Sequence, residues 1–302
     1  MCSACFVIIV DQFEIQRKKL RQPLRSQIKT TALLTRTTSC SKILIMKSLF
    51  VSLILLFQST LFAFIGGQVA KKGQFSFIAM IEYNCTTSII AANKLLLAAH
   101  CVNLIKGDNS LYVGQEIMLY TSPVVVGSQP TRIKIKKIDV HPWWQEKINQ
   151  GLHASAFMFS NETSDLAIIT LEENIKTSPS VQVISFDFQA LKIKQPVYAG
   201  GYGCEEREVP SRNPKYKFAL KPVKSFRGNF VFLDTTNLKP KGSSMACEGD
   251  SGGPVFILKN KKYYIVGVNS RVWGDKEKDG RLSFVNIAKH KDWIIKILAD
   301  NY

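Results

Sequence analysis

The sequence predicts an all-β protein with one helix near its carboxyl end. Short apolar and β-branched segments recur from residue 64 onward, each bounded by Gly, Pro, Asn or Lys. Residues 132–136 alternate basic and apolar side chains, the period of a strand with one face in water. A helical apolar stripe is convincing only at Trp293, Ile294, Ile297 and Leu298. Such closely spaced short strands favour a barrel or sandwich over two separable domains.

Each predicted element follows from its local pattern. The predicted strands include residues 75–81, 88–91, 95–98, 124–126 and 132–136. Residues 255–258 and 263–268 read as a hairpin, because the four residues between them are polar. The helix is expected from about Lys289 onward. The chain shows no repeat of fixed period and no low-complexity linker.

Composition excludes several classes of protein. The 302 residues are 46% apolar and 21% charged, so the chain can bury a large core and is neither disordered nor collagen-like. The formal charge is +17, of which residues 1–45 carry +6 and residues 64–302 carry +10. The sequence has no zinc-ligand spacing, RNP-type aromatic run or basic heptad array. We therefore expect a solvated basic surface and no nucleic-acid partner.

The amino-terminal segment has the pattern of a secretory signal peptide over residues 46–63. Lys47 precedes an apolar core at residues 49–57, and the small residue Ala63 ends the segment. Residues 1–45 are then an upstream extension that the mature protein lacks, and residues 64–302 form the folded domain. Two alternatives remain: residues 48–65 could stay as a membrane anchor, or residues 1–45 could be a mitochondrial transit peptide. A signal peptide predicts a secreted, extracellular protein.

Cysteine usage favours secretion. Removal of residues 1–63 leaves Cys85, Cys101, Cys204 and Cys247. An even number of cysteines is what an oxidising compartment favours. The sequons at Asn84 and Asn161 are compatible with a secreted surface.

Three residues could carry catalytic chemistry. Ser251 stands in the glycine-rich segment 249–254, and a serine hydroxyl needs an adjacent base before it can act as a nucleophile. His100 closes the apolar run 95–99, and Asp165 opens another apolar strand, where a carboxylate needs a hydrogen-bonding partner. Taken separately, these residues could equally be a turn serine, a core histidine and a capping aspartate.

The order His100, Asp165, Ser251, each in its own local context, resembles the chymotrypsin-like (trypsin-family) serine proteases. The segments Phe64-Ile-Gly-Gly and Gly201-Tyr-Gly extend the resemblance over residues 64–302. It implies two orthogonally packed six-stranded antiparallel β-barrels with a carboxy-terminal helix, and an active site in the cleft between the barrels.

The resemblance also assigns catalytic roles. Ser251 would be the nucleophile, His100 the general base and then the general acid, and Asp165 the group that orients the imidazole. The backbone amides of Gly249 and Ser251 would form the oxyanion hole. No cofactor or metal is implied. Partners would be protein or peptide substrates and protease inhibitors, with a membrane involved only if residues 48–65 remain as an anchor, and the enzyme would be a monomer.

Activation would depend on the new amino terminus. In the family, the ammonium freed by processing pairs with the aspartate at the position of Asp250, so here it would belong to Phe64. Cleavage after Ala63 would release this terminus directly, without a zymogen segment. Phe64 departs from the usual Ile or Val at this position.

The resemblance places four residues at the primary specificity pocket: Met245, Ser270, Val272 and Leu282. Met245 stands where trypsins carry an aspartate, so cleavage after Lys or Arg is not expected. Bulky Val272 and Leu282 imply a shallow apolar pocket of elastase or chymotrypsin type, or a filled one. Trp143 and Trp144 lie in a long stretch before Asp165 and could project over the cleft or pack in the core.

Family disulfides are implied in the same way. Cys85 and Cys101 have the spacing of the bridge behind the catalytic histidine. Cys247 lacks its usual partner, so we expect an unusual bridge between Cys204 and Cys247, with two free thiols as the alternative.

The leading hypothesis is a secreted serine endopeptidase. The alternative is a catalytically weak or inactive homologue that acts as a protein-binding module. A third possibility is a protein that binds anionic polymers, suggested by two lysine clusters: Lys259, Lys261 and Lys262, and Lys134, Lys136 and Lys137.

Overall fold

The computed structural model describes eight stretches of the chain. They are residues 67–81, 85–102, 111–122, 127–175, 183–203, 214–234, 249–273 and 281–300. The chain divides into two units after Thr60, and all described residues belong to the second. Predictions that lie outside the described residues concern the extension 1–45, the signal peptide 46–63, strand 124–126, the sequon at Asn84, Phe64, Cys204, Met245 and Cys247.

Six strands close into the first antiparallel barrel, in the order β2-β3-β4-β7-β6-β5. They are β2 (Ile78–Ile81), β3 (Cys85–Ala91), β4 (Lys94–Leu97), β5 (Glu116–Tyr120), β6 (Thr131–Val140) and β7 (Ala167–Leu171). Every residue of β2, β4 and β7 is buried, so both faces of these strands are covered, because successive side chains point to opposite faces. In β6, the exposed and buried residues alternate over Arg132–Lys136, as the sequence predicts.

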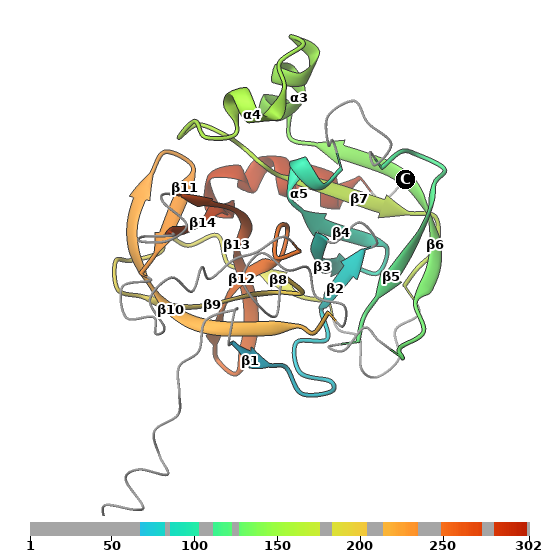
Figure 1. Cartoon of the computed structure of the whole chain (residues 1–302), viewed down its shortest axis with the longest axis horizontal. Coiled ribbons are helices and arrows are strands. Elements are labelled where there is room, and N and C mark those ends of the chain that lie inside the picture. The colour runs from blue at the N-terminus through green and yellow to red at the C-terminus, as the bar shows by residue number, and fades with distance from the viewer. Residues whose placement is uncertain are drawn as a thin grey trace, which may run out of the picture. The chain divides into compact units, whose positions relative to one another are not determined.

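The second barrel is a ring of six strands that the pairing of β9 with β10 closes. Its strands are β9 (Pro196–Gly201), β10 (Lys217–Arg227), β11 (Phe230–Leu233), β12 (Pro254–Lys259), β13 (Lys262–Trp273) and β14 (Arg281–Asn286). The short β1 (Gln68–Val69) adds to β10, and β8 (Ser185–Phe186) pairs with β13 in parallel. Figure 1 shows β2 to β7 grouped apart from β9 to β14. The predicted two-barrel fold is confirmed.

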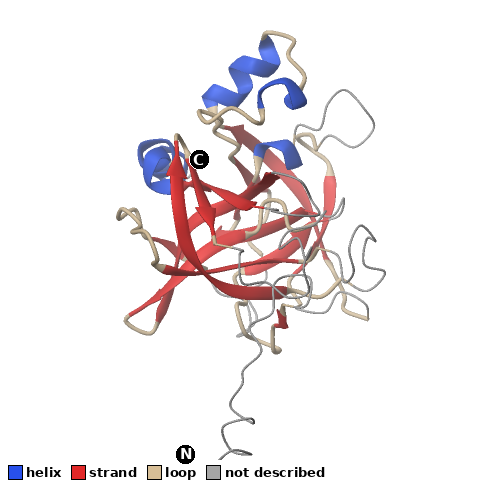
Figure 2. Cartoon of the chain, turned by 60° about the vertical axis from the view of Figure 1, so that its left-hand side comes forward, coloured by secondary structure: helices blue, strands red, loops and turns tan. Residues whose placement is uncertain are grey.

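Helices are short and few among the described residues (Figure 2). They are η1 (Ala99–Cys101), α3 (Pro142–Asn149), α4 (Ala154–Phe157), η2 (Ile287–His290) and α5 (Lys291–Ala299). The predicted carboxy-terminal helix is α5, which begins two residues later than expected. Buried Lys94 of the first barrel reaches the end of α5, where its Nζ donates to the carbonyl oxygen of Asp300 at 3.1 Å.

The long stretch before Asp165 forms α3 and α4, which project from the first barrel (Figure 1). Trp144 is fully buried, with its ring 4.8 Å from that of Phe157. Trp143 is half-buried and also contacts Phe157. Packing of α3 on α4 therefore accounts for both tryptophans.

Candidate active site

Asp165 lies at the entrance to β7 and is fully buried. Its carboxylate accepts three hydrogen bonds: from Nδ1 of His100 at 2.7 Å, from the backbone N–H of His100 at 2.9 Å and from Oγ of Ser270 at 2.6 Å. A buried charge is costly unless it is paired and hydrogen-bonded, and these donors meet both conditions. The structure thus brings together three of the residues that the sequence selected.

His100 lies in η1, directly after the buried strand β4. Its side chain is 14% exposed, so the ring can be reached from one side. Burial lowers the pKa of His100, but the charge of Asp165 and the hydrogen bond to it outweigh burial and raise the pKa above 6.5. Burial would raise the pKa of Asp165, but His100 and the donated hydrogen bonds lower it below 3.8. The pair therefore favours a charged carboxylate beside the imidazole.

Ser251 lies in a turn between Gly249 and Gly253, at the entrance to β12. The turn needs glycines because Gly249 has φ +100° and Gly252 has φ +80°. A Cβ on Gly252 would lie 2.4 Å from the carbonyl oxygen of Thr86 and 3.2 Å from the nitrogen of Ala98. The Ser251 turn thus packs against the segment that carries His100.

Thr86 of β3 holds this turn from the first barrel. Its N–H donates to the carbonyl oxygen of Ser251 at 2.9 Å, and its Oγ1 donates to that of Gly249 at 2.6 Å. The same Oγ1 accepts from the N–H of Tyr202 at 3.0 Å. Sequence analysis missed Thr86, although Thr86-Thr87-Ser88 is a run of three hydroxyl side chains in a buried strand, which is a usable signal.

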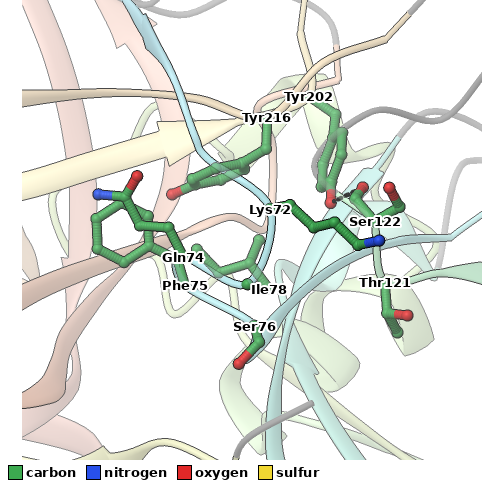
Figure 3. A pocket seen from close by; sticks show the side chains of 10 residues that line it. Lys72, Gln74, Phe75, Ser76, Ile78, Thr121, Ser122, Tyr202 and Tyr216 are labelled. Carbon is green, nitrogen blue, oxygen red and sulfur yellow. Dashed lines mark hydrogen bonds between the residues drawn. The ribbon is translucent and has the colours of Figure 1, made fainter. Parts of the chain in front are cut away.

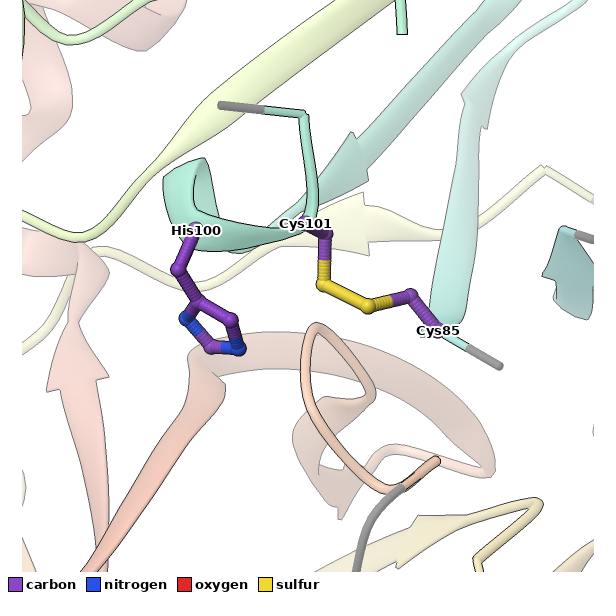
Figure 4. A group of neighbouring side chains, drawn as sticks. All are labelled: Cys85, His100 and Cys101. Atoms are coloured by element: carbon purple, nitrogen blue, oxygen red, sulfur yellow. A yellow bond between two sulfur atoms is a disulfide. The ribbon is translucent and has the colours of Figure 1, made fainter. Parts of the chain in front are cut away.

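A disulfide joins Cys85 to Cys101, so it links the neighbour of Thr86 to the neighbour of His100. Figure 4 shows the His100 ring beside this bridge. The ligand atoms of these three side chains lie within 4.8 Å of one another, as in a metal site. Because the two sulfur atoms are bonded to each other, neither can act as a thiolate ligand, and the cluster does not fit a metal ion.

Asp250 is 2% exposed and lies against the Gly201-Tyr-Gly segment. Its Oδ1 accepts from the N–H of Gly203 at 2.9 Å. A Cβ on Gly201 would lie 2.3 Å from Oδ1, and a Cβ on Gly203 would lie 2.6 Å from Cγ, so both positions need glycine. The expected partner of Asp250, Phe64, is outside the described residues.

The predicted pocket residues are only partly described. Ser270 is 6% exposed and its hydroxyl is directed at Asp165, as given above. Leu282 is 1% exposed and belongs to the apolar core of the second barrel. It is the cross-strand partner of Val272. Met245 lies outside the described residues.

Arg271 is a second residue that sequence analysis missed. It is 6% exposed, its guanidinium carbon lies 3.6 Å from the centre of the Phe230 ring, and one terminal nitrogen donates to the carbonyl oxygen of Ser160 at 2.9 Å. Burial lowers the pKa of Arg271 to about 10, while the charge of Asp165 opposes this shift. Its position directly after Ser270 was the available signal.

A further pocket of about 130 Å³ lies beside Tyr202, the residue whose N–H donates to Thr86 (Figure 3). Its lining includes Lys72, Phe75, Ser122 and Tyr202, and Tyr202 Oη donates to the Ser122 carbonyl oxygen at 2.8 Å. It contains none of the predicted catalytic or specificity residues.

Within the described part of the chain, every helix is too short or too polar to cross a lipid bilayer.

A sequence profile described as "Trypsin" matches residues 64–294. The chain belongs to the trypsin family of serine proteases. CLIP domain-containing serine protease B4 of Anopheles gambiae is 27% identical over 269 residues, which cover 76% of this chain and 69% of that protein. Chymotrypsin-like elastase family member 1 of Macaca fascicularis is 25% identical, covering 72% of this chain and 80% of that protein. A venom protease of Bombus pensylvanicus is 24% identical, covering 68% of this chain and 87% of that protein. Membership of this protease family implies protein substrates.

Proposed function

We propose that this chain is a secreted, monomeric serine endopeptidase that cleaves peptide bonds through an acyl-enzyme. The observation that carries the proposal is the set of three hydrogen bonds to Asp165, two of which come from His100. The hydrogen bond from Nδ1 leaves Nε2 of His100 with its lone pair, so Nε2 is the basic nitrogen. The Ser251 turn, held by Thr86, packs against the segment that carries His100, and Ser251 would be the nucleophile.

The reaction follows from these positions. Oγ of Ser251 attacks the carbonyl carbon of the scissile bond as its proton passes to Nε2 of His100. Collapse of the tetrahedral intermediate breaks the C–N bond, and His100 gives the proton to the leaving amine. Water then hydrolyses the acyl ester, with His100 again taking and returning a proton.

The backbone supports an oxyanion hole at Gly249 and Ser251. Among the hydrogen bonds between described residues, the N–H groups of Gly249 and Ser251 find no acceptor. We propose that both N–H groups donate to the negative oxygen of the tetrahedral intermediate, whose stabilisation is usually worth a few kcal/mol per donor. Asp250 is buried and stands between these two residues in the sequence. Its carboxylate would pair with the ammonium of Phe64 and so fix the conformation of the turn.

The primary specificity pocket would accept an apolar side chain of the substrate. Leu282 in the barrel core opposite Val272, with Met245 in place of an acidic residue, favours small apolar side chains over Lys or Arg. The same burial of Leu282 favours the second candidate, a weakly active or inactive homologue that binds a protein partner. A filled specificity pocket would block peptide cleavage and leave the three catalytic residues, His100, Asp165 and Ser251, in place.

Labelling with a fluorophosphonate tests the proposal. The secreted protein is treated with the reagent beside Ser251→Ala and beside Ser155→Ala, an exposed serine at the start of α4. Labelling of the wild type and Ser155→Ala but not of Ser251→Ala supports a working triad. No labelling of folded protein contradicts it.

The same sample decides two further points. Amino-terminal sequencing that begins at Phe64 supports cleavage after Ala63, and any other start contradicts it. Digestion of a peptide library shows which residues precede the cleaved bonds. Cleavage after small apolar residues supports the proposed specificity, and cleavage after Lys or Arg overturns it. Labelling without cleavage of any peptide would favour the binding homologue.

A further inference from the structure

A groove of about 590 Å³ lies on the second barrel, and none of the proposed catalytic residues lines it. The turn at residues 191–196 forms one side, and residues 257–259 of β12 form the other. Leu191, Ile257 and Val266 give it an apolar lining, and Lys192, Lys194 and Lys259 stand among the exposed residues around it. The tip of the β12–β13 hairpin, residues 260–262, continues from the second side. We call this region the lysine groove.

The charge of the lysine groove is strongly one-sided. Residues 183–203 and 254–266 contain five lysines, all exposed: Lys192, Lys194, Lys259, Lys261 and Lys262. Asp187 is the one acidic residue in these two segments, and its Oδ2 is paired with Nζ of Lys259 at 3.0 Å. The remaining four ammonium groups carry a net positive charge along the groove and the hairpin tip.

Two of these lysines occupy backbone conformations that disfavour lysine. Lys194 has φ +66° and Lys261 has φ +62°, values that favour Gly or Asn. They are two of the four non-glycine residues with positive φ in the described part of the chain. Lys259 and Lys262 are also direct cross-strand partners, a repulsive pairing of like charges. Lys261 stands in the two-residue turn of the β12–β13 hairpin, where the twist of the strands itself requires positive φ. Lysine at this position and at position 194 costs stability relative to Gly or Asn, which points to a use for its charge.

We propose that the lysine groove binds a sulfated polysaccharide. Ammonium groups that follow a groove and continue along a hairpin suit a linear polyanion, which can contact them in succession. None of the described residues lining the groove is aromatic or arginine, so it offers neither the stacking surfaces nor the guanidinium forks typical of nucleic-acid sites. This partner also rests on the proposed secretion, because such polymers are extracellular.

The site would tether the protease to a matrix without taking part in catalysis. Binding driven by ammonium groups releases counterions and weakens steeply as salt rises. Occupancy of the groove would therefore set where the enzyme acts and leave hydrolysis of a small ester substrate unchanged.

Binding to heparin tests this proposal, measured with full-chain Ser251→Ala so that the result does not depend on activity. The groove variant carries Lys194→Asn, Lys261→Asn and Lys262→Thr. The matched control carries Lys134→Gln, Lys136→Gln and Lys137→Gln, three exposed lysines of β6, and loses the same charge. We expect the groove variant to bind heparin roughly 10- to 100-fold more weakly, and the control to change less than about threefold.

A stability measurement separates loss of the site from loss of the fold. Asn tolerates positive φ better than Lys, so the groove variant should melt at or above the temperature of the parent protein. Equal losses of heparin binding in both variants would overturn the proposal in favour of a diffuse basic surface. Tighter binding to phosphatidylserine vesicles or to poly(dT) than to heparin would also overturn it. Heparin binding by protein that no fluorophosphonate labels would leave this proposal standing and contradict the proposed catalysis alone.

Discussion

Thr86 offers a sharp test of how the Ser251 turn is held. Replacement by Val keeps the shape of the buried side chain and removes its hydroxyl. In the native protein this hydroxyl donates to the carbonyl oxygen of Gly249 and accepts from the N–H of Tyr202. Thr86→Val therefore leaves two buried backbone groups without a partner, one of them in the residue that would supply an oxyanion-hole amide.

The magnitude follows from these two groups. A buried polar group left without a hydrogen bond costs about 1–3 kcal/mol, so the pair predicts a loss of about 3 kcal/mol in the free energy of unfolding. For a domain of this size the melting temperature would fall by roughly 6–12 °C. Because the Gly249 carbonyl is no longer held, we also expect the fluorophosphonate to react at least about tenfold more slowly.

Thr87→Val is the matched control, since Thr87 is the next residue and is also fully buried. Its Oγ1 donates to the carbonyl oxygen of Leu96 within the β3–β4 pair, away from the Ser251 turn. This variant should lose about 1–2 kcal/mol and label at the wild-type rate. Thermal unfolding and the second-order rate of labelling are measured for both proteins.

One result would refute the reasoning. If Thr86→Val and Thr87→Val label at equal rates while both proteins are folded, the Thr86 hydroxyl does not position the turn. Equal stability losses would likewise show that the second hydrogen bond, to Tyr202, contributes nothing.

Three further predictions concern the groups around the His100 ring. Ser270→Ala removes a donor to Asp165, so the low pKa of that carboxyl rises toward 3.8. We expect a loss of about 1.5–3 kcal/mol at pH 7 by urea unfolding, which shrinks at pH 3 because the carboxyl of the unfolded chain is then largely protonated. A loss that is the same at both pH values would show that the serine acts by packing. Because the pKa of His100 is raised, lowering the pH should halve the labelling rate while the pH is still above 6.5, since the imidazole is then protonated and cannot act as a base. A midpoint below 6.5 would contradict the charge of Asp165 as the cause. Replacing Cys85 and Cys101 together by Ser should cost about 3 kcal/mol by thermal unfolding, given their separation of 16 residues, and a melting temperature within 2 °C of the wild type would contradict this.

The sequence predicted the strands wherever a local period was present. Alternation over residues 132–136 and the polar turn between residues 258 and 263 are properties of neighbouring residues, so β6 and the β12–β13 hairpin could be located directly. The beginning of α5 was misplaced by two residues, because the preceding Ile287–His290 segment forms the separate turn η2. Closure of two separate barrels came from family resemblance, since pairings such as β9 with β12 and β11 with β14 join segments that lie far apart in the chain.

The sequence by itself selected His100, Asp165 and Ser251 as candidate catalytic residues, because their order along the chain, each in its local context, resembles that of one protease family. Tertiary structure alone decided what surrounds them. The hydrogen bond from Ser270 to Asp165 spans 105 residues, and that from Thr86 to Gly249 spans 163. No local pattern encodes such contacts, since they depend on how two barrels pack. Folding of the second barrel placed Leu282 in its apolar core, where side-chain size alone could not tell a pocket wall from a filled interior.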